Sequence, residues 1–203
     1  MGARMRIELA RIGGVSVIQD EDGRVHWEAG GAIDADGANG QNGAKFAYRM
    51  DDKGLDALKN AGWPSGSWDN VLFDRGDGHP LADDDGNVYS KTTYAWKGRA
   101  IPTRYVDAAT VPYVVVNPLV RQRAVGIVMG CRALVTYKGK SVAAVVADVS
   151  GAARIGELSI AAAKALGIPS SPRKGGTDTG VTYEMWPGSA AIIDGAIYEL
   201  QRA

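Results

Sequence analysis

The sequence predicts a mainly β fold, with a barrel or sandwich core and one packed helix. Glycine accounts for 27 of the 203 residues and is spread along the whole chain, as expected for many short strands joined by turns. Short runs rich in valine and isoleucine recur through the second half of the chain. Only one longer stretch, the alanine-rich segment 156–167, has the composition and the stop signals of a helix.

The first half of the chain is expected to open with strands and to continue as loops. Turn-forming residues separate the apolar runs, and a cluster rich in glycine, asparagine and aspartate follows them. Long loops inside a compact domain are usually functional or poorly ordered. The predicted elements are strands over 5–12, 15–20 and 24–29, an irregular segment over 31–43, a two-turn helix over 51–62 and a long loop over 63–87.

The second half is expected to be strongly β. Its apolar runs end at Asn-Pro, glycine or Lys-Gly-Lys turns, which are typical of strand ends. The helix is expected to stop at Gly167, with Pro169 just beyond it. The predicted elements are strands over 87–96, 111–117, 124–129, 131–137 and 140–148, a helix over 156–167, and a closing strand pair over 190–201. We expect a single domain spanning residues 1–203.

Composition excludes several classes of function. Lysine and arginine together number 23, as do aspartate and glutamate, so the formal charge is zero and a nucleic-acid partner is not expected. Cys131 is the only cysteine, which rules out a disulfide within the chain and a cysteine zinc site. The acidic segment beginning at Asp34 fails the EF-hand spacing, because Ala38 and Lys45 stand at ligand positions. We therefore expect no metal and no cofactor.

Two carboxylates mark the edges of the most informative stretch. An apolar strand ends at Asp148, and Glu157 follows nine residues later at the predicted start of the helix. The connection between them is short, so the two side chains must lie near each other. Paired acids at a cleft are what glycoside hydrolysis requires, since one protonates the leaving oxygen while the other activates water or attacks the sugar.

A structural interpretation of the same two acids stays open at this point. Acids near a helix N-terminus interact favourably with the helix dipole, so Glu157 could simply stabilise the start of the helix. Asp148 could simply end its strand. Spacing alone does not separate these roles from catalysis.

The sequence resembles glycoside hydrolase family 75, the fungal-type endo-chitosanases and their bacterial relatives. The resemblance covers about residues 31–193, and the segment around Asp148 and Glu157 is its most specific part. The segments that carry it, in the family's order, are IDADGA (33–38), GLDALKNAGWP (54–64), YSKTT (89–93), RYVDAATVPYVVVNP (104–118), ADVSGAARIGELSIAAAKALGI (147–168) and MWPGS (185–189).

The resemblance implies a fold, an activity and a pair of catalytic residues. The fold is a double-psi-like β-barrel with one or two packed helices. The activity is endo-acting hydrolysis of β-1,4 bonds in an amino-sugar polymer, with inversion at the anomeric carbon. Glu157 would be the proton donor and Asp148 the base, and we expect a widely spaced pair with Glu157 the more buried.

Five further residues are candidates for substrate binding. Asp34 and Asp36 match the family segment, although they could equally stabilise a turn. Lys91 also lies in a family-like segment. Tyr94 and Trp186 are candidates for stacking on the apolar face of a sugar ring.

Three functions remain under consideration. Chitosan hydrolysis leads, cell-wall glycan (peptidoglycan) hydrolysis by a phage or secretion-system protein is a variant, and a non-catalytic carbohydrate-binding module is the alternative. We expect a monomer whose partner is a polysaccharide, with no membrane span. A polymer-degrading enzyme is expected outside the cell or at the cell wall, although no signal peptide is visible at the N-terminus.

Overall fold

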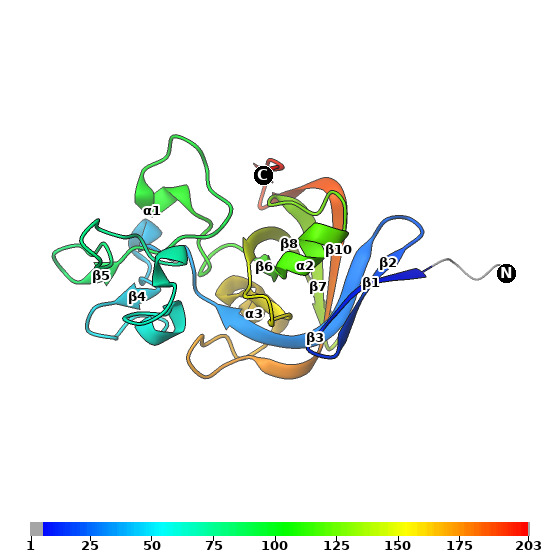
Figure 1. Ribbon diagram of the computed structural model, residues 1–203, viewed down its shortest axis with the longest axis horizontal. Helices are drawn as coiled ribbons and strands as arrows, with labels where there is room; N and C mark the ends of the chain where they lie inside the picture. The colour runs from blue at the N-terminus through cyan, green and yellow to red at the C-terminus, as the bar shows by residue number, and fades with distance from the viewer. Residues whose placement is uncertain (1–5, 203) are drawn as a thin grey trace.

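The computed structural model describes residues 6–202, and its fold is mainly β, with 42% strand and 14% helix (Figure 1). Six strands form a closed barrel. The mainly β prediction is therefore confirmed. In order around the ring, the strands are β3 (Val25–Asp34), β9 (Glu157–Ser159), β6 (Tyr113–Val116), β8 (Lys140–Val149), β7 (Cys131–Tyr137) and β10 (Thr177–Ile193).

The barrel mixes parallel and antiparallel pairs. β3 runs parallel to β9, and β6 runs parallel to β8. The other four neighbouring pairs are antiparallel, and the pairing of β10 with β3 closes the ring. Closure leaves no free edge in the barrel itself, and the mixed ring fits the double-psi-like barrel that was expected.

Short elements flank the barrel on both sides. A hairpin of β1 (Arg6–Ile12) and β2 (Val15–Asp20) extends the sheet beyond β3, and β11 (Ala196–Tyr198) extends it beyond β10. The α-helices in the described part of the chain are α1 (Ile101–Arg104), α2 (Pro118–Arg123) and α3 (Ile160–Leu166). α3 packs against β8, β9 and β3, and α2 packs against β1.

Residues 35–110 form a lobe beside the barrel, between the end of β3 and the start of β6 (Figure 1). Regular structure is sparse in this lobe. It consists of α1, the strand pair β4 (Tyr48–Arg49) and β5 (Asn87–Val88), and the 3-10 turns Gln41–Gly43, Leu58–Ala61 and Trp68–Asn70. The helix predicted over 51–62 is wrong, because only a 3-10 turn forms there, and the strand predicted over 87–96 is reduced to β5.

Polar side chains hold the lobe together where strands do not. The buried Asn39 side chain donates to the Ser90 carbonyl at 2.9 Å and accepts from the Ser90 N–H at 2.8 Å. The Ser90 hydroxyl in turn accepts from the Gly37 N–H at 3.0 Å. A buried amide needs such partners, because an unpaired one would cost free energy. This network joins the segment after β3 to the segment that leads into Thr93.

Arg173 fastens the lobe to the turn that follows α3. Its guanidinium donates to the backbone carbonyls of Asp52 at 2.6 Å and Asp56 at 2.9 Å. A planar guanidinium can contact several acceptors at once. This part of the lobe is therefore tied to the turn after α3 by a side chain from a distant part of the sequence.

Two of the strong sequence signals lead to different structure. The predicted helix over 156–167 begins only at Ile160, so Glu157 lies in the strand β9. The run 124–129 is not a strand, because Gly126 has a φ of +92° and the chain turns there. At Glu157, pairing with β3 and β6 rather than local composition decides the backbone conformation.

Gly156 provides a test of how tightly β9 is held. Its φ is +88°, and a Cβ at this position would lie 2.6 Å from the Gly30 carbonyl oxygen. Its own carbonyl accepts from the Ala32 N–H at 2.9 Å. We expect Gly156→Ala to lower the free energy of unfolding by more than about 1 kcal/mol, because alanine is strained at positive φ.

Gly151 is the matched control for this substitution. It lacks a positive φ, and a Cβ there would meet no atom within 4 Å. Urea denaturation should show Gly151→Ala close to wild type and Gly156→Ala clearly destabilised. Equal stability of the two variants would contradict the close packing of Gly156 on β3.

Candidate functional site

A β-bulge in β8 directs Asp148 toward the face that carries Glu157. In the pairing of β6 with β8, Val114 is opposite Val146, but Val115 is opposite Asp148, so Ala147 is the extra residue. A bulge re-aims the side chains that follow it, and bulges are common beside functional sites. Without this extra residue, Asp148 would be opposite Val116 and would point to the other face of the sheet. The Ala147 carbonyl accepts from the Tyr94 N–H at 2.8 Å.

Glu157 and Asp148 flank the same residue of β6. Val115 is the registered partner of Asp148 on one side and of Glu157 on the other. Registered partners present their side chains on one face, so the three side chains form a row across β8, β6 and β9. Ala32 of β3 is opposite Glu157 and extends the row. Since neighbouring strands lie about 4.8 Å apart, the Cα atoms of the two acids are separated by roughly 10 Å.

The Asp148 side chain is held rigidly by one of its oxygens. Oδ1 accepts from the Thr93 N–H at 3.0 Å, from the Thr93 hydroxyl at 2.7 Å and from the Val149 N–H at 2.8 Å. Among the described residues, none is seen to donate to Oδ2. The first oxygen therefore fixes the orientation of the carboxyl group, and the second is available to a ligand.

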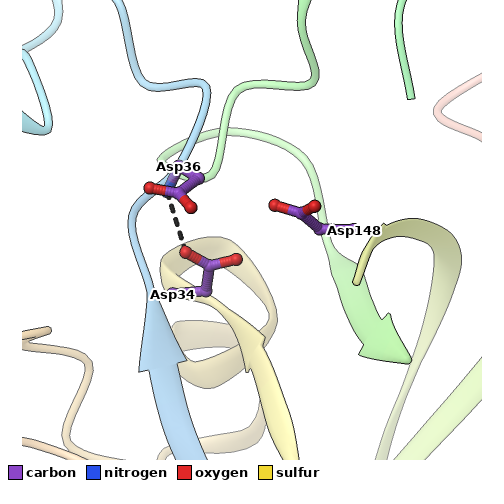
Figure 2. A group of neighbouring side chains, drawn as sticks. All are labelled: Asp34, Asp36 and Asp148. Atoms are coloured by element: carbon purple, nitrogen blue, oxygen red, sulfur yellow. Dashed lines mark hydrogen bonds between the residues drawn. The ribbon is translucent and has the colours of Figure 1, made fainter. Parts of the chain in front are cut away.

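Asp34 and Asp36 lie beside Asp148, and the three carboxyl groups point toward one another (Figure 2). Each contributes an oxygen that lies within 4.8 Å of the others. Asp34 is at the end of β3, two residues beyond Ala32 and hence on the same face of that strand. Asp34 Oδ1 accepts from the Asp36 N–H at 2.9 Å, which is the dashed line in Figure 2.

Two buried tyrosines complete the surroundings of these acids. The Tyr48 hydroxyl donates to Asp36 Oδ1 at 2.7 Å, and the Tyr113 hydroxyl donates to the Asp36 carbonyl at 3.1 Å. Tyr48 belongs to the lobe and Tyr113 to the barrel. Burial and the neighbouring carboxylates raise the pKa of both phenols well above the usual value, so they remain donors.

All four acids line one cleft between the lobe and the barrel, with a volume of about 650 Å³. The lobe contributes Tyr48, Asp56 and Asn60 to its walls. A second hollow, also about 650 Å³, shares Asp36, Asn60 and Asp148 with the first and leads on toward Lys91. Because they share these residues, the two hollows form one continuous cleft.

The carboxyl groups in this cleft resist ionisation. Burial, followed by the charge of Asp34, raises the pKa of Asp148 to about 7 and that of Glu157 to about 8. Burial also raises the pKa of Asp34 to about 6 and that of Asp36 well above its usual range. The guanidinium of Arg154 opposes the effect at Glu157. The site therefore retains protons on carboxyl groups near neutral pH.

The helix-cap interpretation of the two acids does not hold. The N-cap of α3 is Ser159, whose hydroxyl accepts from the Ala162 N–H at 3.1 Å. Glu157 precedes the helix, in a strand, and Asp148 accepts its hydrogen bonds from Thr93 and Val149. The expectation that Glu157 is the more buried of the pair is also wrong, because Asp148 is only 8% exposed whereas Glu157 is partly exposed.

The structure separates the predicted substrate-binding residues into two groups. Asp34 and Asp36 lie in the acidic part of the cleft, and Lys91 lies in its extension, where its ammonium donates to the Asp69 carbonyl. Tyr94 and Trp186 lie elsewhere. Tyr94 is 1% exposed and packs against Trp96 and Tyr198 in the core.

Trp186 lies against Arg132, whose guanidinium carbon is 4.0 Å from the ring centre. It lines a separate hollow over β7, β8 and β10. The proposed stacking role of Tyr94 and Trp186 in this cleft is therefore corrected, because aromatic character alone does not distinguish a core residue from a sugar platform.

Sequence reasoning missed three residues of the site. Tyr48 and Asp56 line the cleft from the lobe, and Thr93 orients Asp148. Asp56 and Thr93 lie inside the segments 54–64 and 89–93, so the family-like segments were a usable signal for them. Tyr48 lies outside all of these segments, so its contact with Asp36 could not be predicted from the sequence.

The cluster of Asp34, Asp36 and Asp148 has the spacing that a cation could bridge, but acidic clusters are common without one. A proton shared among the three groups relieves the same repulsion. We assign no metal to this cluster.

A scan against protein-family models finds no match for the chain, and a search of curated proteins finds none either. Within residues 6–202, no helix is both long and apolar enough to cross a membrane.

The raised pKa values predict how stability changes with pH. Unfolded aspartate and glutamate titrate near pH 4, whereas Asp34, Asp148 and Glu157 titrate at about 6, 7 and 8 in the folded chain. The folded state therefore holds more protons between these values, so the free energy of unfolding falls as the pH rises from about 5 to about 8. Calorimetry at constant ionic strength should show the melting temperature falling across this range.

The variant Asp148→Asn serves as the control for that fall. An amide does not titrate, so its melting temperature should depend less on pH over the same range. A wild-type melting temperature that rises from pH 5 to pH 8 would contradict the assignment of raised pKa values to these carboxyls.

Proposed function

We propose that the chain is an inverting, endo-acting glycoside hydrolase that cleaves β-1,4 bonds in an amino-sugar polymer, with chitosan as the substrate. One observation carries the proposal: Asp148 and Glu157 flank Val115 on the same face of the barrel and open into one cleft. Inverting enzymes hold their two carboxyl groups about 6.5–9.5 Å apart, because a water molecule must fit beside the sugar. Acids two strands apart, with Cα atoms about 10 Å from each other, suit that spacing.

The surroundings of the two acids favour Glu157 as the proton donor. Asp148 accepts three hydrogen bonds, which stabilise its ionised form. Among the described residues, the Glu157 side chain makes no hydrogen bond. Burial and the charge of Asp34 raise the pKa of both acids, to about 7 for Asp148 and about 8 for Glu157. The assignment of roles therefore rests on the hydrogen bonds, which favour Asp148 as the proton acceptor and leave Glu157 free to keep its proton.

In the proposed reaction, each of the two acids transfers one proton. Glu157 gives its proton to the glycosidic oxygen, and the bond from that oxygen to the anomeric carbon breaks. Asp148 takes a proton from a water molecule as the water oxygen bonds to the anomeric carbon from the opposite side. The open Oδ2 of Asp148 is the atom available for this step.

The charge of the cleft favours a cationic polymer. Five acids line its main part, against Arg154 as the one basic residue lining it among those described. The lining acids that are ionised near neutral pH, such as Asp34 with a pKa of about 6, attract the ammonium groups of chitosan and repel the carboxylates of peptidoglycan strands. This contrast supports chitosan over the cell-wall variant.

The convergence of the family-like segments adds independent support. The segments 33–38, 54–64, 89–93 and 147–168 are far apart in the sequence, yet each contributes a side chain to the cleft. The carbohydrate-binding alternative rests on exposed aromatic platforms, and the described cleft lining has only Tyr48, which is buried. That alternative therefore has less support.

The direct test is hydrolysis of glucosamine oligosaccharides by the wild type and by Glu157→Gln. We expect the wild type to release shorter products and the variant to lose activity by about 10²–10⁴-fold, because glutamine cannot donate the proton. Glu28→Gln, an exposed glutamate of β3 outside the cleft lining, is the control and should keep full activity.

Three outcomes separate the candidate functions. Wild-type activity in Glu157→Gln would contradict the catalytic assignment. Release of sugars from purified cell-wall sacculi, with none from chitosan, would favour the peptidoglycan variant. Binding of oligosaccharides without any hydrolysis by the wild type would favour the carbohydrate-binding module.

The stereochemistry of the first product tests the spacing of the acids. A wide pair acts through water and yields the α-anomer from a β-linked substrate. Proton NMR during the first turnovers should therefore show the α-anomer before mutarotation. If the β-anomer forms first, Asp148 attacks the sugar directly and the pair is a retaining one.

A further inference from the structure

Asp34 is a buried carboxyl group that lies next to both proposed catalytic acids. It is 7% exposed and lies at the end of β3, where its backbone pairs with Ser159 of β9. Glu157 is two residues before Ser159 on β9, so its side chain lies on the same face as that of Asp34, displaced by two residues along the strand. The carboxyl group of Asp34 is thus near Glu157 through the β3–β9 pair and near Asp148 through the cluster of Figure 2.

No cation neutralises Asp34. In the described part of the chain, no arginine, lysine or histidine lies within ion-pair distance of its carboxyl group. The basic residue that lines the main cleft is Arg154, and it is exposed. Asp34 therefore presents an uncompensated negative charge to the acids around it whenever it is ionised.

We propose that Asp34 is a positioning residue that keeps Glu157 protonated, so that Glu157 can act as the proton donor. The role rests on the glycosidase function proposed above, but the protonation of Glu157 can be measured without any substrate. A buried like charge on the same face of the neighbouring strand is an effective way to keep a carboxyl group protonated.

The order of titration agrees with this role. The pKa of Asp34, about 6, is below the values of about 7 and about 8 for Asp148 and Glu157. Asp34 therefore ionises before Glu157. Its charge is the largest electrostatic contribution from any neighbour to the raised pKa of both other acids.

Other groups facing the cluster must be considered together with Asp34. Asp36, Tyr48 and Asp56 face it from the lobe, Tyr113 from β6, Asp148 from β8, Tyr183 from β10, and Glu157 and Arg154 from β9 and the loop before it. Of these, Asp148 and Asp56 contribute smaller repulsions at Glu157 than Asp34 does, and Arg154 acts in the opposite direction. Removing the charge of Asp34 should therefore have a large effect on Glu157.

The test is a carbon-13 NMR titration of the carboxyl groups in the free protein. In Asp34→Asn, the pKa of Glu157 should fall by about one unit or more, because the amide carries no charge. In Asp34→Glu, which keeps the charge, the pKa of Glu157 should remain close to the wild-type value. Asp107→Asn is the matched control, since Asp107 is 6% exposed but lies outside the cleft lining, and it should leave Glu157 unchanged.

The same variants give a second result when activity is measured. The alkaline limb of kcat/KM reports the proton donor of the free enzyme, so it should move to lower pH in Asp34→Asn and stay in place in Asp34→Glu. A residue with only a structural role would lower activity at every pH without moving the limb.

Several outcomes would overturn the proposal. An unchanged Glu157 titration in folded Asp34→Asn would do so. If that variant fails to fold, the wild-type titration decides. The proposal requires Asp34 to lose its proton at a lower pH than Glu157, and the reverse order would overturn it. A wild type that shows these titrations but hydrolyses no glycan would instead overturn the proposed function and leave the influence of Asp34 on Glu157 standing.

Discussion

The position of β6 between β8 and β9 is the constraint on which the site depends. A single residue of this strand, Val115, has Asp148 on one side and Glu157 on the other. The distance between the acids is then set by backbone hydrogen bonding across two strand pairs, which varies little. Long side chains on mobile loops could not hold such a distance, whereas a closed barrel cannot change it without breaking its ring.

Burial of several carboxyl groups is costly, and the fold limits that cost with hydrogen bonds from the lobe. Thr93 supplies two donors to Asp148, and Tyr48 supplies one to Asp36. These donors can approach because Asn39 and Ser90 lock the lobe beside the end of β3. The polar network of the lobe is thus part of the electrostatics of the site, since it decides which oxygens are satisfied and which remain open.

Much of the barrel could be predicted from the sequence, because long β-branched runs leave few alternatives. The strands β6, β7 and β8 lie inside the predicted segments 111–117, 131–137 and 140–148 with small differences at their ends. The short connection between Asp148 and Glu157 also predicted correctly that these two acids lie near each other. Local pattern sufficed for these three β-branched strands.

The errors arose where tertiary pairing overrides local pattern. β9 has three residues and precedes an alanine-rich helix, so nothing in its composition separates it from the helix start. The bulge at Ala147 could not be predicted from the sequence, because it lies within a run of small apolar residues. Tyr94 and Trp186 have the composition of sugar-binding residues, yet one fills the core and the other packs on Arg132. Such distinctions depend on contacts between residues that are distant in the chain.

The lobe is a single excursion of the chain between two barrel strands, and this has a consequence for how the protein could diversify. Asp148 and Glu157 both belong to the barrel, within one short stretch, whereas Asp56 and Asn60 on the opposite wall belong to the excursion. Changes in loop length or composition within 35–110 that spare Asp36, Tyr48 and Thr93 would reshape the wall that meets a ligand and leave the paired acids on their strands with their hydrogen bonds. The architecture therefore places the two acids that would perform the chemistry on the barrel and several groups that would select the molecule on the lobe, so that the second set can vary with little effect on the first.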